Sequence, residues 1–368
     1  MDCSILLVFL EQSYQNYISI MQQKNCIPID ALRFIFMMMI CLWHCNGIAP
    51  FLTHGYIAVE FFFILSGFLI YKSFISHREI GALDFTIKRI KRFYTPYILS
   101  IILMMLLDRK QYIFLSDFSA EGVVKTYFSH IPEYLMLQNI GIYDGYEING
   151  PLWFISVLII GGGILYAGLR SDFRRMINLY LPVFCLVSFN AFLCNGSHAF
   201  QNPEYNIMFF SKTMMRGISE MGFGILVAYV FQQKTALFID HKKSLDILAI
   251  ISLLIMLLIS LTCNSYDYLA LIATPILITS SFTNHSLLQR IFSNKCWTFL
   301  GGLAMEMLFI HLFVASVYYI LANRYDWISH ISSFVMVFIY FLIVILSAYT
   351  LRVVSNKCNH HFFNKQRT

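Results

Sequence analysis

The stretch IDALRFIFMMMICLWHCNG, residues 29–47, decides the fold, because it is a long apolar run that carries two ionisable side chains, Arg33 and His44. About 20 mostly apolar residues in a helix cross a bilayer, where lipid offers the backbone no water to bond. An ionisable side chain inside the bilayer costs roughly 2.5–3.5 kcal/mol. The stretch therefore predicts a membrane helix whose Arg33 and His44 face the protein interior and serve a function.

Composition extends this prediction to the whole chain. Hydrophobic residues make up 58% of the 368 and charged residues only 12%, whereas soluble domains carry about a quarter charged residues. We predict an all-α, polytopic transmembrane bundle of about ten helices, the third of which starts at 93 or includes the amphipathic segment before it. The expected spans are 31–50, 56–76, 93–108, 150–169, 176–194, 212–231, 245–263, 266–283, 299–321 and 329–353.

The distribution of basic residues predicts the orientation of the bundle. Cytoplasmic loops of membrane proteins collect lysine and arginine. With the N-terminus inside, most of the 26 lysines and arginines fall on the inner side, so we expect both termini to be cytoplasmic. The net charge of +6 then follows from topology and not from nucleic-acid binding.

The chain is expected to form one membrane domain over residues 25–356, with an N-terminal extension, 1–24, and a cytoplasmic tail, 357–368. The extension has no basic start and no small-residue cleavage site, so no signal peptide is expected, and Met21 is an alternative start. The outer excursion 109–149 carries several acidic residues, and its part 121–139 is expected to form an interfacial helix.

Nine cysteines are scattered through the chain without a C-x-x-C pair. Cys41 and Cys45 flank His44 on one helix, which raises the question of a metal site. No further ligands stand at zinc spacing, so we interpret these cysteines as small packed side chains and expect no metal.

Arg33 and His44 are expected on one face of their helix. At 3.6 residues per turn and 1.5 Å per residue, 11 positions separate them by only about 20° around the axis and about 16 Å along it. Two simpler interpretations remain: Arg33 as a membrane-boundary anchor and His44 as a hydrogen-bonded interior histidine.

Five further segments carry motifs that form one set with the first segment. They are GYIAVEFFFILSGFLIY (55–71), DFTIKRIKRFYTPY (84–97), GPLWFISVL (150–158), RGISEMGFGILVAY (216–229) and LGGLAMEMLFIHLF (300–313). Together they resemble the acyltransferase 3 family, integral-membrane enzymes that O-acetylate bacterial surface polysaccharides. Two positions depart from the family pattern: Glu60 stands where many relatives have Asp, and the Glu that many relatives place after Trp153 is missing.

The motifs of the family are matched in order from residue 27 to about residue 350. Arg33 and His44 match its Arg-x10-His pair, and Phe61 to Leu69 match its aromatic second span. The remaining matches are Arg89, Arg92 and Pro96 in a basic signature, Leu152 and Trp153 at the start of a span, Arg216, Glu220 and Gly222 in one helix, and His311 in a late span.

The resemblance implies an acyl-CoA donor, most simply acetyl-CoA, and a carbohydrate or lipid-linked glycan acceptor in the bacterial inner membrane. The catalytic candidates are His44, Arg33, His311 and Glu60. The donor-binding candidates are Arg33, Lys72, Lys88, Arg89 and Arg92. The acceptor-binding candidates are Trp153, Arg216 and Glu220. Besides membrane lipid no other partner is implied, no nucleic acid is expected, and the oligomeric state stays open, a homodimer included.

The residue chemistry agrees with these roles. CoA is a polyanion, and KRIKR at 88–92 gathers cations at the inner mouth, although membrane anchoring alone also accounts for such a cluster. His44 is a candidate general base for a sugar hydroxyl or a covalent acyl carrier. His311 lies at a similar expected depth, so the two histidines are expected to meet; His311 then orients His44, polarises the carbonyl, holds the acceptor or is only structural.

Two other functional classes are also polytopic. A transporter or glycan flippase would show inverted repeats or matched broken helices, and the sequence shows neither. A polysaccharide polymerase would place catalytic arginines in long outer loops, which hold few basic residues here. Both remain alternatives to acyl transfer.

Overall fold

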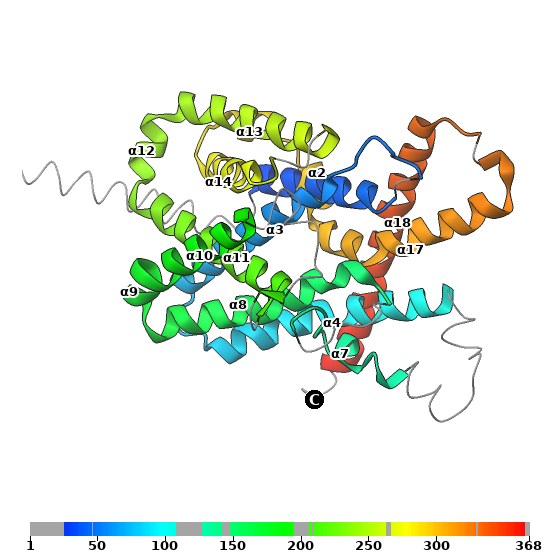
Figure 1. The fold of residues 1–368 in the computed structure, drawn as a ribbon, viewed down its shortest axis with the longest axis horizontal. Helices are drawn as coiled ribbons and strands as arrows, with labels where there is room; N and C mark the ends of the chain where they lie inside the picture. The colour runs from blue at the N-terminus through cyan, green and yellow to red at the C-terminus, as the bar shows by residue number, and fades with distance from the viewer. Residues whose placement is uncertain are drawn as a thin grey trace, which may run out of the picture.

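The computed structural model describes residues 26–45, 47–107, 127–141, 148–194, 206–207, 210–262, 266–328 and 330–364. The expected extension 1–24 and the segment 108–126 lie outside the described residues. Figure 1 shows a bundle of helices with α2 (Ile27–Trp43) and α3 (Ala58–Ser76) running through its middle.

The other helices surround this pair. In chain order they are α4 (Ala82–Leu107), α7 (Ile131–Tyr134), α8 (Trp153–Ser171), α9 (Phe173–Arg175), α10 (Leu181–Cys194), α11 (Lys212–Gln233), α12 (Thr235–Asp240), α13 (Lys242–Thr262), α14 (Leu269–Phe282), α15 (Leu287–Ile291), α16 (Cys296–Gly302), α17 (Ala304–Arg324) and α18 (Ser333–Asn364). A π-helical turn joins α9 to α10, and 3-10 turns precede α3, α8 and α18. The two short strands β1 (Asn206–Ile207) and β2 (Phe210–Ser211) pair antiparallel just before α11.

The prediction of an all-α polytopic bundle is confirmed. Eight helical segments of the described chain are long and apolar enough to cross a membrane. The other two expected spans, 31–50 and 266–283, correspond to the shorter helices α2, which begins at residue 27 and has 17 residues, and α14, which has 14. His44 caps the C-terminal end of α2, and α14 carries Pro275 in its interior.

The structure decides one boundary that the sequence left open and corrects one expected helix. α4 includes the amphipathic segment from residue 82 and is one 26-residue helix with Pro96 inside it. No continuous interfacial helix covers the described part of 121–139, where only the single turn α7 is α-helical. Met136 and Asn139 adopt left-handed backbone conformations, with φ of 59° and 51°, which a helix does not accommodate.

Close packing of α3 against α11 sets the geometry of the interior. A Cβ added at Gly67 would lie 1.8 Å from the carbonyl oxygen of Met221, and one added at Gly224 would lie 2.0 Å from that of Ile64. Such glycines let two membrane helices approach backbone to backbone. The crossing brings the N-terminal halves of α3 and α11 together, and these carry Glu60 and Arg216.

Candidate active site

The structure brings two predicted histidines together at the end of α2. His44 caps α2, and its ring centroid lies 5.1 Å from that of His311 in α17. His311 is fully buried, whereas His44 is partly exposed and lines a pocket. Trp43 also packs against His44, with its ring centroid 4.5 Å from that of His44.

Hydrogen bonds fix which nitrogen of His311 carries the proton. Its Nδ1 lies 3.1 Å from the carbonyl oxygen of Met307 and 2.9 Å from that of Leu308. A carbonyl oxygen only accepts, so Nδ1 is the donor, and Nε2 of the neutral ring holds a lone pair. Within the described chain Nε2 has no hydrogen-bond partner. His311 therefore presents a buried, vacant proton acceptor beside His44.

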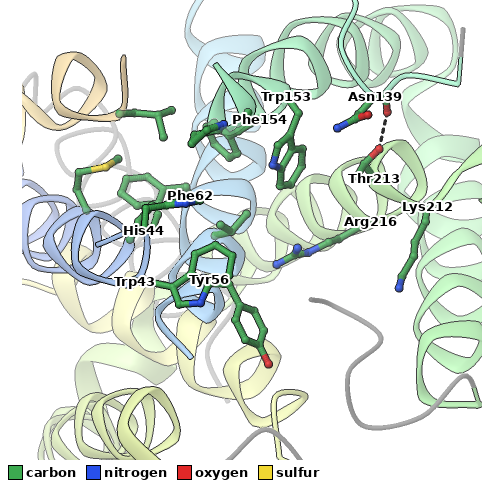
Figure 2. Close-up of a pocket in the computed structure, with 16 residues that line it drawn as sticks. Trp43, His44, Tyr56, Phe62, Asn139, Trp153, Phe154, Lys212, Thr213 and Arg216 are labelled. Carbon is green, nitrogen blue, oxygen red and sulfur yellow. Dashed lines mark hydrogen bonds between the residues drawn. The ribbon is translucent and has the colours of Figure 1, made fainter. Parts of the chain in front are cut away.

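A pocket of about 270 Å³ opens beside His44 (Figure 2). Its aromatic lining is Trp43, Tyr56, Phe62, Trp153 and Phe154. Its polar lining is His44, Asn139, Lys212, Thr213 and Arg216. Apolar rings joined by a few convergent polar groups are typical of a site for a small organic ligand. Trp153, predicted from its motif, is thus in the same pocket as His44.

Three charged side chains form a buried group next to this pocket. Arg216 Nε donates to Glu220 Oε1 at 3.1 Å, and Arg216 Nη2 donates to Glu60 Oε1. All three residues are buried, and Glu60 and Glu220 are fully so. In the described structure the second oxygen of each glutamate has no hydrogen-bond partner. One guanidinium therefore holds two carboxylates, each of which keeps an oxygen able to accept a hydrogen bond.

Arg33 lies apart from the histidines. Its Nη1 is 3.5 Å from Asp30 Oδ1, and Arg92 and Glu306 are its other charged neighbours. Among the described residues the lining of the pocket does not include Arg33. Arg33 and His44 thus mark opposite ends of α2, with His44 at the pocket end.

The other predicted donor-binding cations are found at two kinds of position. Lys72 near the end of α3 lies 5.3 Å from the ring of Phe282, and Lys88 is exposed on α4. Arg89 instead points into the α4–α8 interface, where its Nη1 donates to the carbonyl oxygen of Leu158 at 3.3 Å. Within KRIKR, Arg89 therefore binds the protein itself, whereas Lys88 and Arg92 face outward.

Several pocket residues were not predicted from the sequence. Tyr56 and Trp43 are aromatic neighbours of predicted residues, and this adjacency is the sequence signal that could have identified them. The Tyr56 hydroxyl donates to Asp267. Asn139 and Lys212 gave no signal, because tertiary contacts alone bring them to the pocket. The structure places no three His, Cys, Asp or Glu side chains together at a metal-binding distance in the part of the chain that it describes.

Comparison with known proteins adds one match. A family model described as an acyltransferase domain, Acyl_transf_3, matches residues 28–353. No curated protein and no solved structure matches the chain. The matched range contains both histidines, the pocket and the buried charged group.

Proposed function

Since the chain belongs to the acyltransferase 3 family and is a membrane acyltransferase, we propose that it moves an acetyl group from acetyl-CoA to a hydroxyl of a cell-surface or lipid-linked polysaccharide at the bacterial inner membrane. The observation that carries this proposal is the pair of His44 and His311 beside an aromatic and polar pocket.

His44 supplies the proton transfer in this proposal. The acceptor oxygen attacks the thioester carbonyl carbon, a C–O bond forms, and the C–S bond breaks. His44 takes the hydroxyl proton and returns it to the sulfur, so that CoA leaves as the thiol. General-base catalysis of this kind contributes about 10²–10⁴-fold. A covalent acetyl-histidine on His44 is the alternative route to the same products.

His311 supports His44 in this step. The two rings are neighbours, and the buried Nε2 of His311 has no partner in the described chain, so in this proposal it accepts a hydrogen bond from the protonated His44. The backbone carbonyls of Met307 and Leu308 hold the tautomer that leaves the lone pair on Nε2. A base oriented by a second fixed group is the arrangement common to enzymes that activate hydroxyls.

The pocket is the acceptor site in this proposal. Trp43, Tyr56 and Trp153 provide flat apolar faces for a sugar ring. Among the described residues of the buried charged group, Arg216 lines the pocket, and Glu60 and Glu220 hold its guanidinium in place.

The donor enters from the end of the bundle at which α2 begins. Arg33, Lys72 and Arg92 provide cations there for the phosphates of CoA. The pantetheine arm then covers the length of α2 from Arg33 to His44, about 16 Å along the helix. This route requires the N-terminus of α2 to face the cytoplasm, as the distribution of basic residues predicts.

Transfer of radiolabel tests the proposed function. The purified full-length protein in nanodiscs is given [¹⁴C]acetyl-CoA and a panel of methyl glycosides of common envelope sugars, with native lipid-linked glycan as a further acceptor. The proposal predicts acetyl ester on at least one acceptor and release of one CoA thiol per ester. A flippase or polymerase would release no thiol and form no ester.

A further inference from the structure

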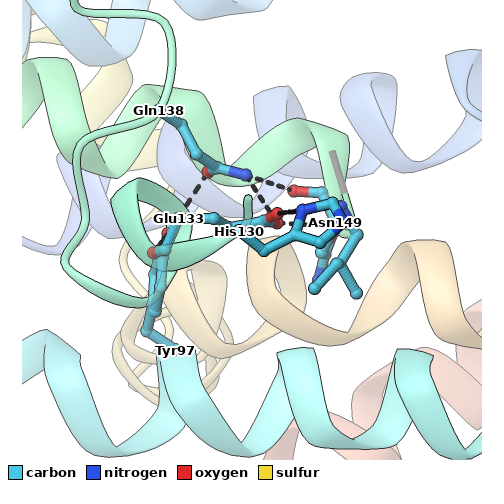
Figure 3. Close-up of polar contacts among 6 residues, drawn as sticks. Tyr97, His130, Glu133, Gln138 and Asn149 are labelled. Atoms are coloured by element: carbon cyan, nitrogen blue, oxygen red, sulfur yellow. Dashed lines mark hydrogen bonds and ion pairs between the residues drawn. The ribbon is translucent and has the colours of Figure 1, made fainter. Parts of the chain in front are cut away.

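A second buried polar cluster lies in the segment between α4 and α8, outside the site described above. The carboxylate of Glu133, fully buried, accepts from Gln138 Nε2 at 2.7 Å, Ile148 N at 3.0 Å and Asn149 N at 3.1 Å (Figure 3). His130 Nδ1 lies 3.3 Å from the same group. Backbone N–H groups only donate, so the Glu133 carboxylate is the acceptor that joins Gln138 to Ile148 and Asn149.

This cluster anchors the segment to three helices. Tyr97 of α4 donates its hydroxyl to the carbonyl oxygen of Glu133 at 2.7 Å. The backbone N–H of Gln138 donates to Ser156 of α8 at 3.1 Å. Asn149 Nδ2 donates to the carbonyl oxygen of Phe309 in α17 at 3.1 Å. Buried networks with this degree of hydrogen bonding specify one rigid arrangement.

Residues next to this cluster form one wall of the pocket. Asn139, Gly150 and Pro151 line this wall; Asn139 follows Gln138, and Gly150 and Pro151 follow Asn149. The Asn139 carbonyl accepts from Ser211 Oγ at 2.8 Å and from Thr213. Asn139 itself adopts a left-handed backbone conformation, which needs support from its surroundings. Glu133 binds Gln138 and Asn149, the residues just before Asn139 and Gly150, so the position of this wall also depends on the hydrogen bonds of Glu133.

The same cluster reaches the histidine pair through α17. Phe309, whose carbonyl Asn149 binds, precedes His311 by two residues in the same helix. Ser100 of α4 also accepts from Asn149 Nδ2, at 3.3 Å. Asn149 thus fixes the turn of α17 that carries His311 relative to α4.

We propose that Glu133 and Asn149 are positioning residues with separate effects: Glu133 sets the loop wall that selects the acceptor, and Asn149 sets the placement of His311. This inference rests on the proposed function. Neither residue touches the reacting atoms. Steady-state kinetics separates the two effects, because the first changes the acceptor KM and the second changes kcat.

The test uses full-length protein in nanodiscs, acetyl-CoA, and the methyl glycoside that the wild type acetylates fastest. Glu133→Gln is expected to raise the acceptor KM about tenfold, which corresponds to the loss of one hydrogen bond to a charged group. Its kcat and its acetyl-CoA KM are expected to stay within about twofold of the wild-type values. Asn149→Asp is expected to lower kcat about tenfold with the acceptor KM within about twofold.

Two further variants complete the test. Tyr97→Phe removes one hydroxyl from the cluster and should raise the acceptor KM about threefold even if Glu133→Gln fails to fold. Glu79→Gln, an exposed glutamate after α3, is the matched control and should leave every constant unchanged.

The outcomes distinguish the two levels of the proposal. A raised acceptor KM for Glu133→Gln or Tyr97→Phe, with a separate kcat effect for Asn149→Asp, supports the inference. Unchanged constants overturn the inference while the proposed function stands. The same holds if kcat and KM both worsen in each variant, in step with its loss of thermal stability. A wild type that forms no ester rejects the proposed function, and this inference with it.

Discussion

Glu60 of α3 and Arg216 of α11 form a buried ion pair across 156 positions of sequence, at the crossing where Gly67 and Gly224 bring the two helices into backbone contact. Both side chains are buried, and Glu220 shares the same guanidinium. Removing one partner of such a pair leaves an uncompensated buried charge. The pair therefore links the packing of the bundle to the chemistry of the pocket.

Replacement of Arg216 by alanine should destabilise the protein strongly, because it leaves two buried carboxylates without their guanidinium. The expected loss is about 3–5 kcal/mol, measured as a lower unfolding temperature in detergent. Arg174→Ala removes an exposed arginine, is the matched control and should leave the unfolding temperature unchanged. Equal unfolding temperatures for Arg216→Ala and the wild type would show that the charged group does not support the fold.

Replacement of Gly67 by alanine should separate α3 from α11. The new methyl group would lie 1.8 Å from the Met221 carbonyl oxygen, and overpacking costs about 1–3 kcal/mol or more. Gly81→Ala is the control, because its Cβ would meet only Asp84 Oδ2 at 3.4 Å. We expect lower yield and lower unfolding temperature for the first variant only; an unchanged Gly67→Ala protein would contradict the close crossing.

Part of this arrangement follows from the sequence. Apolar runs predict the membrane helices, and the spacing of Arg33 and His44 predicts one helix carrying both. The meeting of His44 with His311 follows from their similar depths in two spans, and their ring distance of 5.1 Å agrees. Such features depend on helical periodicity and on the length of apolar run that crosses a bilayer, and both can be read from the local sequence.

The remaining part depends on tertiary contacts. Asn139 reaches the pocket through a left-handed turn and a bond to Ser211, 72 positions away, which no local pattern encodes. Glu133 is one acid among several in the segment 109–149, and only its buried contacts distinguish it. Arg89 belongs to a basic run, yet its guanidinium points into the α4–α8 interface because Gly162 leaves room there.

Arg33→Lys should weaken donor binding. Lysine keeps the charge but lacks the planar guanidinium that binds phosphate through two donors. We expect the acetyl-CoA KM to rise several-fold, which corresponds to the loss of about one hydrogen bond to a charged group. The acceptor KM should stay unchanged. Arg174→Lys, at an exposed position in α9, is the matched control. A normal acetyl-CoA KM for Arg33→Lys would remove Arg33 from the donor site.

His311→Asn separates the structural role of His311 from its chemical role. The asparagine amide can occupy the position of Nδ1 and donate to the Met307 and Leu308 carbonyls, while the Nε2 lone pair is lost. We expect normal folding with kcat lowered by about 10²-fold, the lower range of acid–base contributions. Full activity in a folded His311→Asn protein would assign His311 to packing alone.

The central claim is that His44 carries the chemistry of acyl transfer, and acetyl transfer by the His44→Ala protein tests it most directly. The mutant and wild-type proteins are compared at equal amounts in nanodiscs, with size-exclusion profile and unfolding temperature as checks on folding. We predict that ester formation from [¹⁴C]acetyl-CoA falls by about 10²–10⁴-fold in the folded mutant. Ester formation at the wild-type rate would contradict the account.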